Sequence, residues 1–152
     1  MLEYRIATAA DIELLMDSRL EMLKEVNDLP DDHEYDADFV AQSRKYFLEG
    51  AHTTVLVLDE DKVVACASIS YISIMPTFSH PTGKRAHLMN VYTAKEYRKK
   101  GIGAKMVRML IDDAWERGAT EISLDATEAG RPLYLKCGFV GSESCMTLVR
   151  ST

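Results

Sequence analysis

Apolar and polar residues in the first fifty positions repeat with two different periods, which separates a strand from two helices. Apolar and charged residues alternate over residues 2–6, the pattern of a strand with one buried face. Apolar side chains then recur at helical spacing over residues 12–26, and Thr8 and Asp11 precede them in the arrangement of a helix N-cap. The same spacing predicts a second helix over residues 39–47.

The rest of the chain predicts a hairpin, followed by a strand, a helix and another strand. Two β-rich runs joined by three consecutive acidic residues are typical of a hairpin. A strand–helix–strand unit closes by a right-handed crossover, so we expect its two strands to be parallel neighbours. The predicted segments are the strands Thr53–Leu58 and Lys62–Tyr71, a loop at 73–85, the strand Ala86–Tyr92, a helix to Arg117, the strand Glu121–Ala126, a short helix with Pro132 in its first turn, and last strands at Phe139–Val140 and Met146–Val149.

Composition and charge narrow the class of protein. A chain of 152 residues with 47% hydrophobic content is long enough for one domain with a sizeable core. Its net charge of −6 argues against broad binding to nucleic acid or to an anionic membrane, and no apolar run reaches membrane-spanning length. Three widely spaced cysteines favour a reducing, cytoplasmic setting, and the four histidines are too scattered for a metal motif, so no metal is predicted.

The stretch Asn90–Ala104 has the order of a phosphate-binding site: a short apolar strand, a basic turn with glycine, and the start of a helix. N–H groups in the first turn of a helix have no partner within it, and the helix dipole places partial positive charge there. Glycine allows the main chain to approach an anion closely, and Arg98, Lys99 and Lys100 add charge beside it. The alternative is an ordinary strand–helix loop with solvated basic side chains.

Two features of the first third of the chain bear on the substrate. The segment 27–38 contains six acidic residues, which predicts either a solvated connector or a surface that attracts a cationic amine. Arg19 falls on the apolar stripe of the first helix. Its side chain therefore either extends to the rim and pairs with a carboxylate, or faces a substrate anion.

Four segments resemble the GNAT superfamily of N-acetyltransferases: Val91–Thr93, Tyr97–Gly103, Leu124–Thr127 and Leu133–Phe139. The second has the pattern R-x-x-G-x-G, the last has Y-x-x-x-G-F, and the order of predicted elements agrees over nearly the whole chain. The resemblance implies a single GNAT-like acetyltransferase domain over residues 1–152. Its fold is expected to be α/β (α+β), with a mixed, mostly antiparallel central sheet, a splayed parallel pair of strands, and helices on both faces.

The resemblance also implies acetyl-CoA as the cofactor. Its pyrophosphate would bind to main-chain N–H groups between Arg98 and Ala104. A β-bulge near Asn90–Tyr92 would let the two parallel strands diverge and admit the pantetheine arm. The residues expected to bind the cofactor are Asn90, Val91, Tyr92, Arg98, Lys99, Lys100, Gly101, Ile102, Gly103 and Ala104.

Acetyl transfer to an amine needs two proton movements, one from the amine and one to the departing CoA thiolate. By its place in Y-x-x-x-G-F, Tyr134 matches the family tyrosine near the CoA sulfur and would be the acid; the alternative is a core residue. His87 lies four residues before Val91, so regular alternation places both on one face of the strand, where an imidazole could act as the base. The alternative is a strand histidine hydrogen-bonded to a neighbour, with Asp125 and Glu128 as competing bases. The residues expected near the acceptor are Arg19, Tyr71, Asp125 and Glu128.

We therefore expect an enzyme, an acetyl-CoA-dependent N-acetyltransferase in which a primary amine attacks the thioester directly in a ternary complex. The acceptor is expected to be a small molecule or a peptide, with no nucleic-acid or membrane partner. A non-catalytic acyl-CoA-binding sensor or regulatory module would have the same phosphate site. A Rossmann-like dinucleotide binder fits less well, because the glycine turn lies late in the chain and lacks the third glycine. The last strands, with Cys145 and Met146, are candidates for a homodimer interface.

Overall fold

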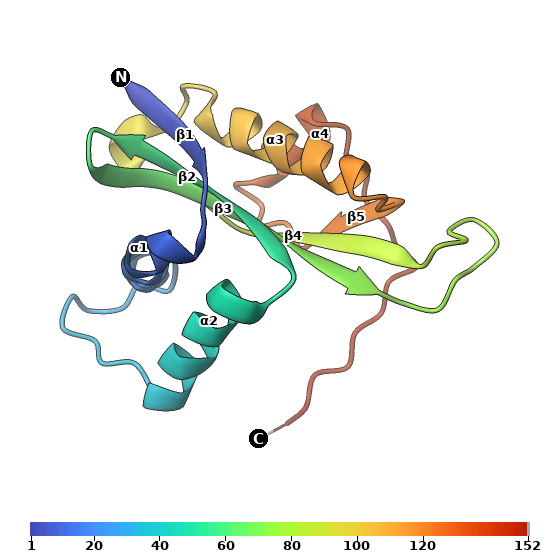
Figure 1. Cartoon of the computed structure of the whole chain (residues 1–152), viewed down its shortest axis with the longest axis horizontal. Helices are drawn as coiled ribbons and strands as arrows, with labels where there is room; N and C mark the ends of the chain where they lie inside the picture. The colour runs from blue at the N-terminus through green and yellow to red at the C-terminus, as the bar shows by residue number, and fades with distance from the viewer. Residues whose placement is uncertain (152) are drawn as a thin grey trace.

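The computed structural model describes residues 1–151 and contains a sheet of five strands, arranged in the order in which they occur along the chain (Figure 1). The elements are β1 (Leu2–Ile6), α1 (Ile12–Val26), α2 (Ala37–Glu49), β2 (His52–Asp59), β3 (Lys62–Ser73), β4 (Lys84–Thr93), α3 (Ile102–Glu116), β5 (Glu121–Leu124) and α4 (Arg131–Lys136), with short 3₁₀ turns η1 (Ala9–Asp11) and η2 (Lys95–Tyr97). Helices α1 and α2 cover one face of the sheet, and α3 and α4 lie on the other (Figure 1). None of the helices in residues 1–151 combines the length and the apolar character that a bilayer crossing requires.

Neighbouring strands are antiparallel except for β4 and β5, which run parallel. Helix α3 connects these two strands, so the predicted crossover and the predicted fold class are both confirmed. Strand β5 ends at Leu124, earlier than the predicted end at Ala126. At the predicted N-cap, the Thr8 N–H donates to Asp11 Oδ2 at 3.0 Å, and η1 intervenes before α1 begins.

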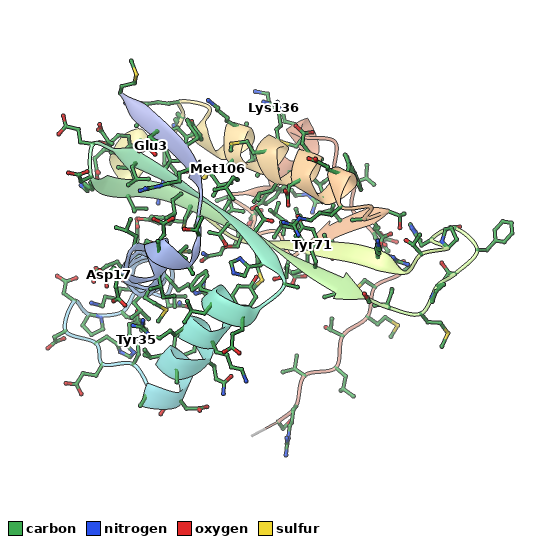
Figure 2. The ribbon with its side chains drawn as sticks, viewed as in Figure 1. Glu3, Asp17, Tyr35, Tyr71, Met106 and Lys136 are labelled. Carbon is green, nitrogen blue, oxygen red and sulfur yellow. The ribbon has the colours of Figure 1, made fainter. Side chains whose placement is uncertain are left out.

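Two apolar clusters hold the helices to the two faces of the sheet. On one face, α3 buries Met106, Val107 and Leu110 completely against the middle strands; Figure 2 shows Met106 between the helix and the sheet. On the other face, Leu15 and Met22 of α1 pack on Leu56 and Leu58 of β2 and on Cys66 of β3. Because α3 is anchored along its length, its first turn is held in place beside the end of β4.

Strand β4 contains a β-bulge at Asn90. The register with β3 pairs Ser68 with Met89 and Cys66 with Tyr92, so two residues of β4 lie opposite one residue of β3. Asn90 has a φ of +59°, in the left-handed region that few residues other than glycine adopt. The bulge expected near Asn90–Tyr92 is therefore present.

The bulge changes which side chains of β4 share a face. Leu88 and Val91 both pack in the α3 cluster, whereas Tyr92 packs in the α1 cluster. His87 pairs with Ser70, which bonds to α2 and so lies on the α1/α2 face. The expectation that His87 and Val91 share a face is wrong, because the extra residue reverses the alternation between them.

The strands predicted at Phe139–Val140 and Met146–Val149 are not formed, and no strand follows β5 in residues 1–151. Instead, the Phe139 N–H donates to the Tyr134 carbonyl at 3.0 Å, and Gly138, at a φ of +101°, closes α4 in a Schellman-type turn. The segment beyond leaves the body of the molecule (Figure 1). Its side chains meet no neighbouring strand: Val140, Met146 and Leu148 are 86%, 92% and 99% exposed.

Candidate active site

Strand β4 has an open edge where it separates from β5. The pairing of the two strands ends at Leu88 and Leu124, but β4 continues to Thr93. The edge of residues 89–93 that faces away from β3 therefore has no strand partner within residues 1–151. N–H and C=O groups along such an edge can pair with an extended ligand, as they would with another strand.

The turn that follows has the geometry of an anion-binding site. Lys99 and Gly101 adopt left-handed φ values of +63° and +81° just before α3 begins at Ile102. Such conformations turn successive N–H groups toward a common point, and the first N–H groups of the helix add to them. A Cβ on Gly101 would meet no atom within 4 Å, so the backbone angle, rather than lack of space, calls for glycine there.

The basic side chains contribute less to this turn than the sequence predicts. Arg98 Nε donates to the Thr93 carbonyl at 2.8 Å, and its Nη2 donates to Glu25 Oε1 at 3.1 Å. Lys100 Nζ lies 5.7 Å from the centroid of the Tyr97 ring. Glu25 therefore offsets the charge of Arg98, while the first N–H groups of α3 have no partner within the helix.

The Tyr92 side chain packs toward α1, with the Arg98 guanidinium 5.8 Å from the centroid of its ring. Its hydroxyl donates to a carboxylate oxygen of Glu25, and burial, followed by this hydrogen bond, raises the pKa of Tyr92 to about 12. The side chain is therefore part of the packing between β4 and α1. Only the main chain of Tyr92 is free to contact a ligand on the open edge.

His87 is brought together with one of its two predicted competitors. His87 Nδ1 and Ser123 Oγ are hydrogen-bonded at 2.8 Å, and His87 Nε2 lies 3.7 Å from Asp125 Oδ2. The parallel register pairs His87 with Ser123 and places Asp125 just past the end of β5. Glu128 is exposed in the turn that leads to α4. Sequence reasoning missed Ser123, although its position two residues before Asp125 could have shown that the two share a strand face.

Tyr134 lies half-buried on α4, beside the start of α3. Its ring packs edge-to-face on Phe139 with centroids 6.0 Å apart, and the neighbouring Leu133 packs on Gly103, whose Cβ would lie 3.2 Å from Leu133 Cδ2. Burial, followed by the proximity of Cys137, raises the pKa of Tyr134. Within residues 1–151 no group forms a hydrogen bond with its hydroxyl, which leaves the hydroxyl able to serve a ligand.

Tyr71 and Arg19 differ in their relation to this site. The Tyr71 hydroxyl donates to Asp113, which also accepts from Thr53 Oγ1 at 2.7 Å. Asp113 lies about 16 Å along α3 from Ile102, at a rise of about 1.5 Å per residue, so Tyr71 belongs to the packing of the far end of that helix. Arg19 lies under the bulge and donates from Nη1 to Asn90 Oδ1 at 2.6 Å, rather than to a carboxylate.

A groove of about 670 Å³ separates α1 from the ends of β3 and β4. Cys66 and Tyr92 form part of its wall, so it reaches the strands beside the bulge. Its charged lining is mostly acidic, from Asp17, Glu21, Glu25, Asp28 and Asp31, against Lys24 and Lys62. The acidic segment 27–38 therefore contributes two carboxylates to a groove.

Comparisons with known proteins agree with this geometry. Residues 15–139 match the sequence model of the acetyltransferase (GNAT) family. The glucosamine 6-phosphate N-acetyltransferase of Arabidopsis thaliana is 28% identical over 107 residues, which are 70% of this chain and 69% of that one. A predicted acetyltransferase from Clostridium acetobutylicum, solved with acetyl-CoA, superposes with a TM-score of 0.85 at 28% identity, over 98% of this chain and 96% of that one. A GCN5-related N-acetyltransferase from Ralstonia eutropha superposes with a TM-score of 0.75 at 25% identity, over 98% of this chain and 99% of that one. This chain belongs to the acetyltransferase (GNAT) family.

Proposed function

We propose that this protein is an acetyl-CoA-dependent N-acetyltransferase in which a primary amine attacks the thioester directly in a ternary complex. One observation carries the proposal: the open edge of β4 leads directly into the anion-binding turn before α3. An extended ligand with amide groups and a diphosphate, such as CoA, can be bound along that continuous main chain. Membership of the family supports acetyl-CoA as the donor.

In this proposal the cofactor is held mainly by backbone groups. Asn90, Val91 and Tyr92 pair with the pantetheine amides through their main chain on the open edge. The diphosphate is bound by N–H groups of the turn and of the first turn of α3, and each hydrogen bond to a charged group contributes about 1.5–3 kcal/mol. The residues of this turn are Arg98, Lys99, Lys100, Gly101, Ile102, Gly103 and Ala104.

The two proton movements are assigned to His87 and Tyr134. His87 accepts the proton of the acceptor ammonium, so that the nitrogen lone pair can attack the thioester carbon. The 3.7 Å between its Nε2 and Asp125 Oδ2 is longer than a hydrogen bond, which leaves that nitrogen free to contact the acceptor. As the C–N bond formed and the C–S bond broke, the Tyr134 hydroxyl would protonate the departing thiolate, and the second proton that the acetylated nitrogen must lose would restore the phenol.

One observation favours a cationic amine as the acceptor, and a second favours a small molecule that carries an amino sugar. The groove beside Tyr92 is lined by carboxylates, which raise the local concentration of cations. The relative from Arabidopsis thaliana is named for glucosamine 6-phosphate, an amino sugar. Amino sugars are therefore the first acceptors to test, followed by aminoglycosides, polyamines, amino acids and peptide amines.

Calorimetry with CoA and turnover with this panel of amines test the proposal. We expect CoA to bind, and CoA to be released from acetyl-CoA only when a suitable amine is present. Released CoA is best measured by chromatography, because the exposed Cys145 would react with thiol reagents. Absence of heat at millimolar CoA would overturn the cofactor assignment. Binding without turnover for every amine would instead favour the alternative, a non-catalytic acyl-CoA-binding sensor or regulatory module.

The quaternary state and compartment are part of the proposal. The exposed apolar residues Met146, Leu148 and Val149 support a homodimer in which this segment packs on a second copy. Light scattering should give a dimer at micromolar concentration and a monomer after deletion of residues 141–152; a monomeric parent protein would end this idea. The free cysteines Cys66 and Cys137 fit the reducing conditions of the cytoplasm, the location that we propose.

A further inference from the structure

Asn90 is held in an unfavourable backbone conformation at the centre of the open edge. Its φ of +59° lies in the left-handed region, which asparagine tolerates better than most residues but still at a cost. The conformation creates the bulge, and the bulge sets the direction of the N–H and C=O groups of residues 89–93. Contacts around Asn90 must therefore offset that cost.

Side chains of two other elements, α1 and β3, form hydrogen bonds with Asn90. From α1, Arg19 Nη1 donates to Asn90 Oδ1 at 2.6 Å. From β3, the Cys66 thiol donates to the Asn90 carbonyl at 3.6 Å, and Asn90 Nδ2 lies 3.8 Å from Cys66 Sγ. Both the side chain and the carbonyl of the left-handed residue are thus engaged.

Arg19 is the only charged residue among Arg19, Cys66 and Asn90, and its guanidinium donates a hydrogen bond to Asn90. Its half-buried guanidinium lies near Tyr35, Tyr46 and Cys66, and burial lowers the pKa of Arg19. Within residues 1–151 it has no carboxylate partner within salt-bridge distance. A hydrogen bond from a partly desolvated cation is stronger than one between neutral groups, so it can offset the cost of the bulge.

We propose that Arg19 is a positioning residue for acetyl transfer: through the Asn90 side chain it fixes the left-handed bulge, and thereby the direction of the main-chain groups that receive the thioester. The proposal rests on the proposed function, because the open edge of β4 is the place assigned there to the cofactor. Arg19 itself touches neither reactant. It acts through Asn90, and this distinguishes it from an arginine that binds an acceptor anion.

A double-mutant cycle tests whether Arg19 acts through Asn90. Arg19→Ala should lower kcat by roughly 10- to 100-fold, the range expected for loss of a hydrogen bond to a charged group. The affinity for CoA should change by less than about threefold, because the diphosphate is held elsewhere. The variant that combines Arg19→Ala with Asn90→Ala should be no slower than Asn90→Ala alone.

Millimolar guanidinium should restore part of the activity of Arg19→Ala. Arg44→Ala, which removes an exposed arginine bonded to Glu13, is the matched control and should have no effect.

Three results would overturn the proposal. The two substitutions could be additive in kcat. Arg19→Ala could raise KM for the acceptor with kcat unchanged, which would make Arg19 an acceptor-binding residue. The chemical shifts of the Asn90 backbone carbons, measured by NMR, could still indicate a left-handed φ in Arg19→Ala. If that variant does not fold, Arg19→Lys provides the same comparisons.

The NMR measurement needs no acceptor amine. It therefore decides the link between Arg19 and Asn90 even if the wild-type protein transfers no acetyl group. In that case the proposed function fails while the structural link is still judged separately.

Discussion

The Tyr134 hydroxyl forms no hydrogen bond within residues 1–151, and the ring that carries it is firmly packed. Phe139 packs edge-to-face on the ring, and a Cβ on Gly130 would lie 3.2 Å from Tyr134 Cε2, so the ring has little room to turn. Burial raises the pKa of Tyr134, so the phenol stays protonated at neutral pH and can donate to a thiolate.

Replacing Tyr134 with phenylalanine should lower kcat by roughly 10- to 1000-fold, because the ring remains but the donor is lost. The KM for acetyl-CoA should change little, and steady-state kinetics measure both values. Tyr4→Phe is the matched control, because Tyr4 lies on β1, at the opposite edge of the sheet from β5. Unchanged turnover in Tyr134→Phe would remove this residue from the mechanism.

At the residue scale, the sequence predicted best those roles that depend only on the backbone of a few consecutive residues. The glycine turn could be predicted because N–H groups at a helix start are free whatever the rest of the fold does. The shared face of His87 and Val91 was predicted wrongly, because regular alternation does not hold across the bulge that the resemblance itself implies near Asn90–Tyr92. The pairing of Arg98 with Glu25 could not be predicted, since it joins residues that are 73 positions apart.

At the scale of elements, the joint between β4 and α3 matters most. Two left-handed residues, Lys99 and Gly101, give the joint its shape. The far end of α3 closes with another left-handed glycine, Gly118, at a φ of +88°. Replacing either glycine therefore introduces similar backbone strain, but only Gly101 lies at the anion-binding turn.

Gly101→Ala should weaken CoA binding by roughly tenfold, because a Cβ disfavours the left-handed angle that aims the N–H groups. Gly118→Ala should leave CoA affinity unchanged, since Gly118 lies at the far end of α3, where its Cβ would meet only the Lys84 side chain at an ordinary 3.6–3.7 Å. Both variants should lose about 1–2 kcal/mol of stability. Calorimetry and denaturant unfolding test the pair. Equal CoA affinities in the two variants would contradict the role of the turn.

The elements themselves could largely be predicted, with one clear failure. Strand–helix–strand order was enough to place β4 and β5 side by side in parallel, because only one handedness of crossover is common. The last strands failed because Gly138 and Phe139 are used to end α4, and because a strand needs a partner edge that this chain does not supply to its own Met146 or Leu148.

For the whole molecule, the three groups whose pKa values are raised most link stability to alkaline pH. Burial is the main cause that raises the pKa values of Cys66, Tyr71 and Tyr92 to about 12 each. In the unfolded chain these groups lose their protons at lower pH. Between the pKa of a group in the unfolded chain and its pKa in the folded chain, the folded state therefore holds more protons. Stability therefore falls as pH rises through that window.

The free energy of unfolding should change little from these groups up to about pH 9 and should then decrease toward pH 12. Denaturant titrations at several pH values measure this slope. Tyr71→Phe removes one of the three groups, so its slope above about pH 9 should be shallower, even though the loss of the hydrogen bond to Asp113 lowers stability at every pH. Identical slopes for both proteins would count against the linkage.

The extra residue in β4 also separates what the strand needs for packing from what it needs for binding. Without Asn90, regular alternation from Leu88 would still place Val91 toward α3 and Tyr92 toward α1, the faces on which they lie now. Deleting Asn90 would therefore keep both side chains in their apolar layers and remove the bulge that sets the direction of the main-chain groups at the open edge. The length of this strand is thus set by its open edge rather than by the core.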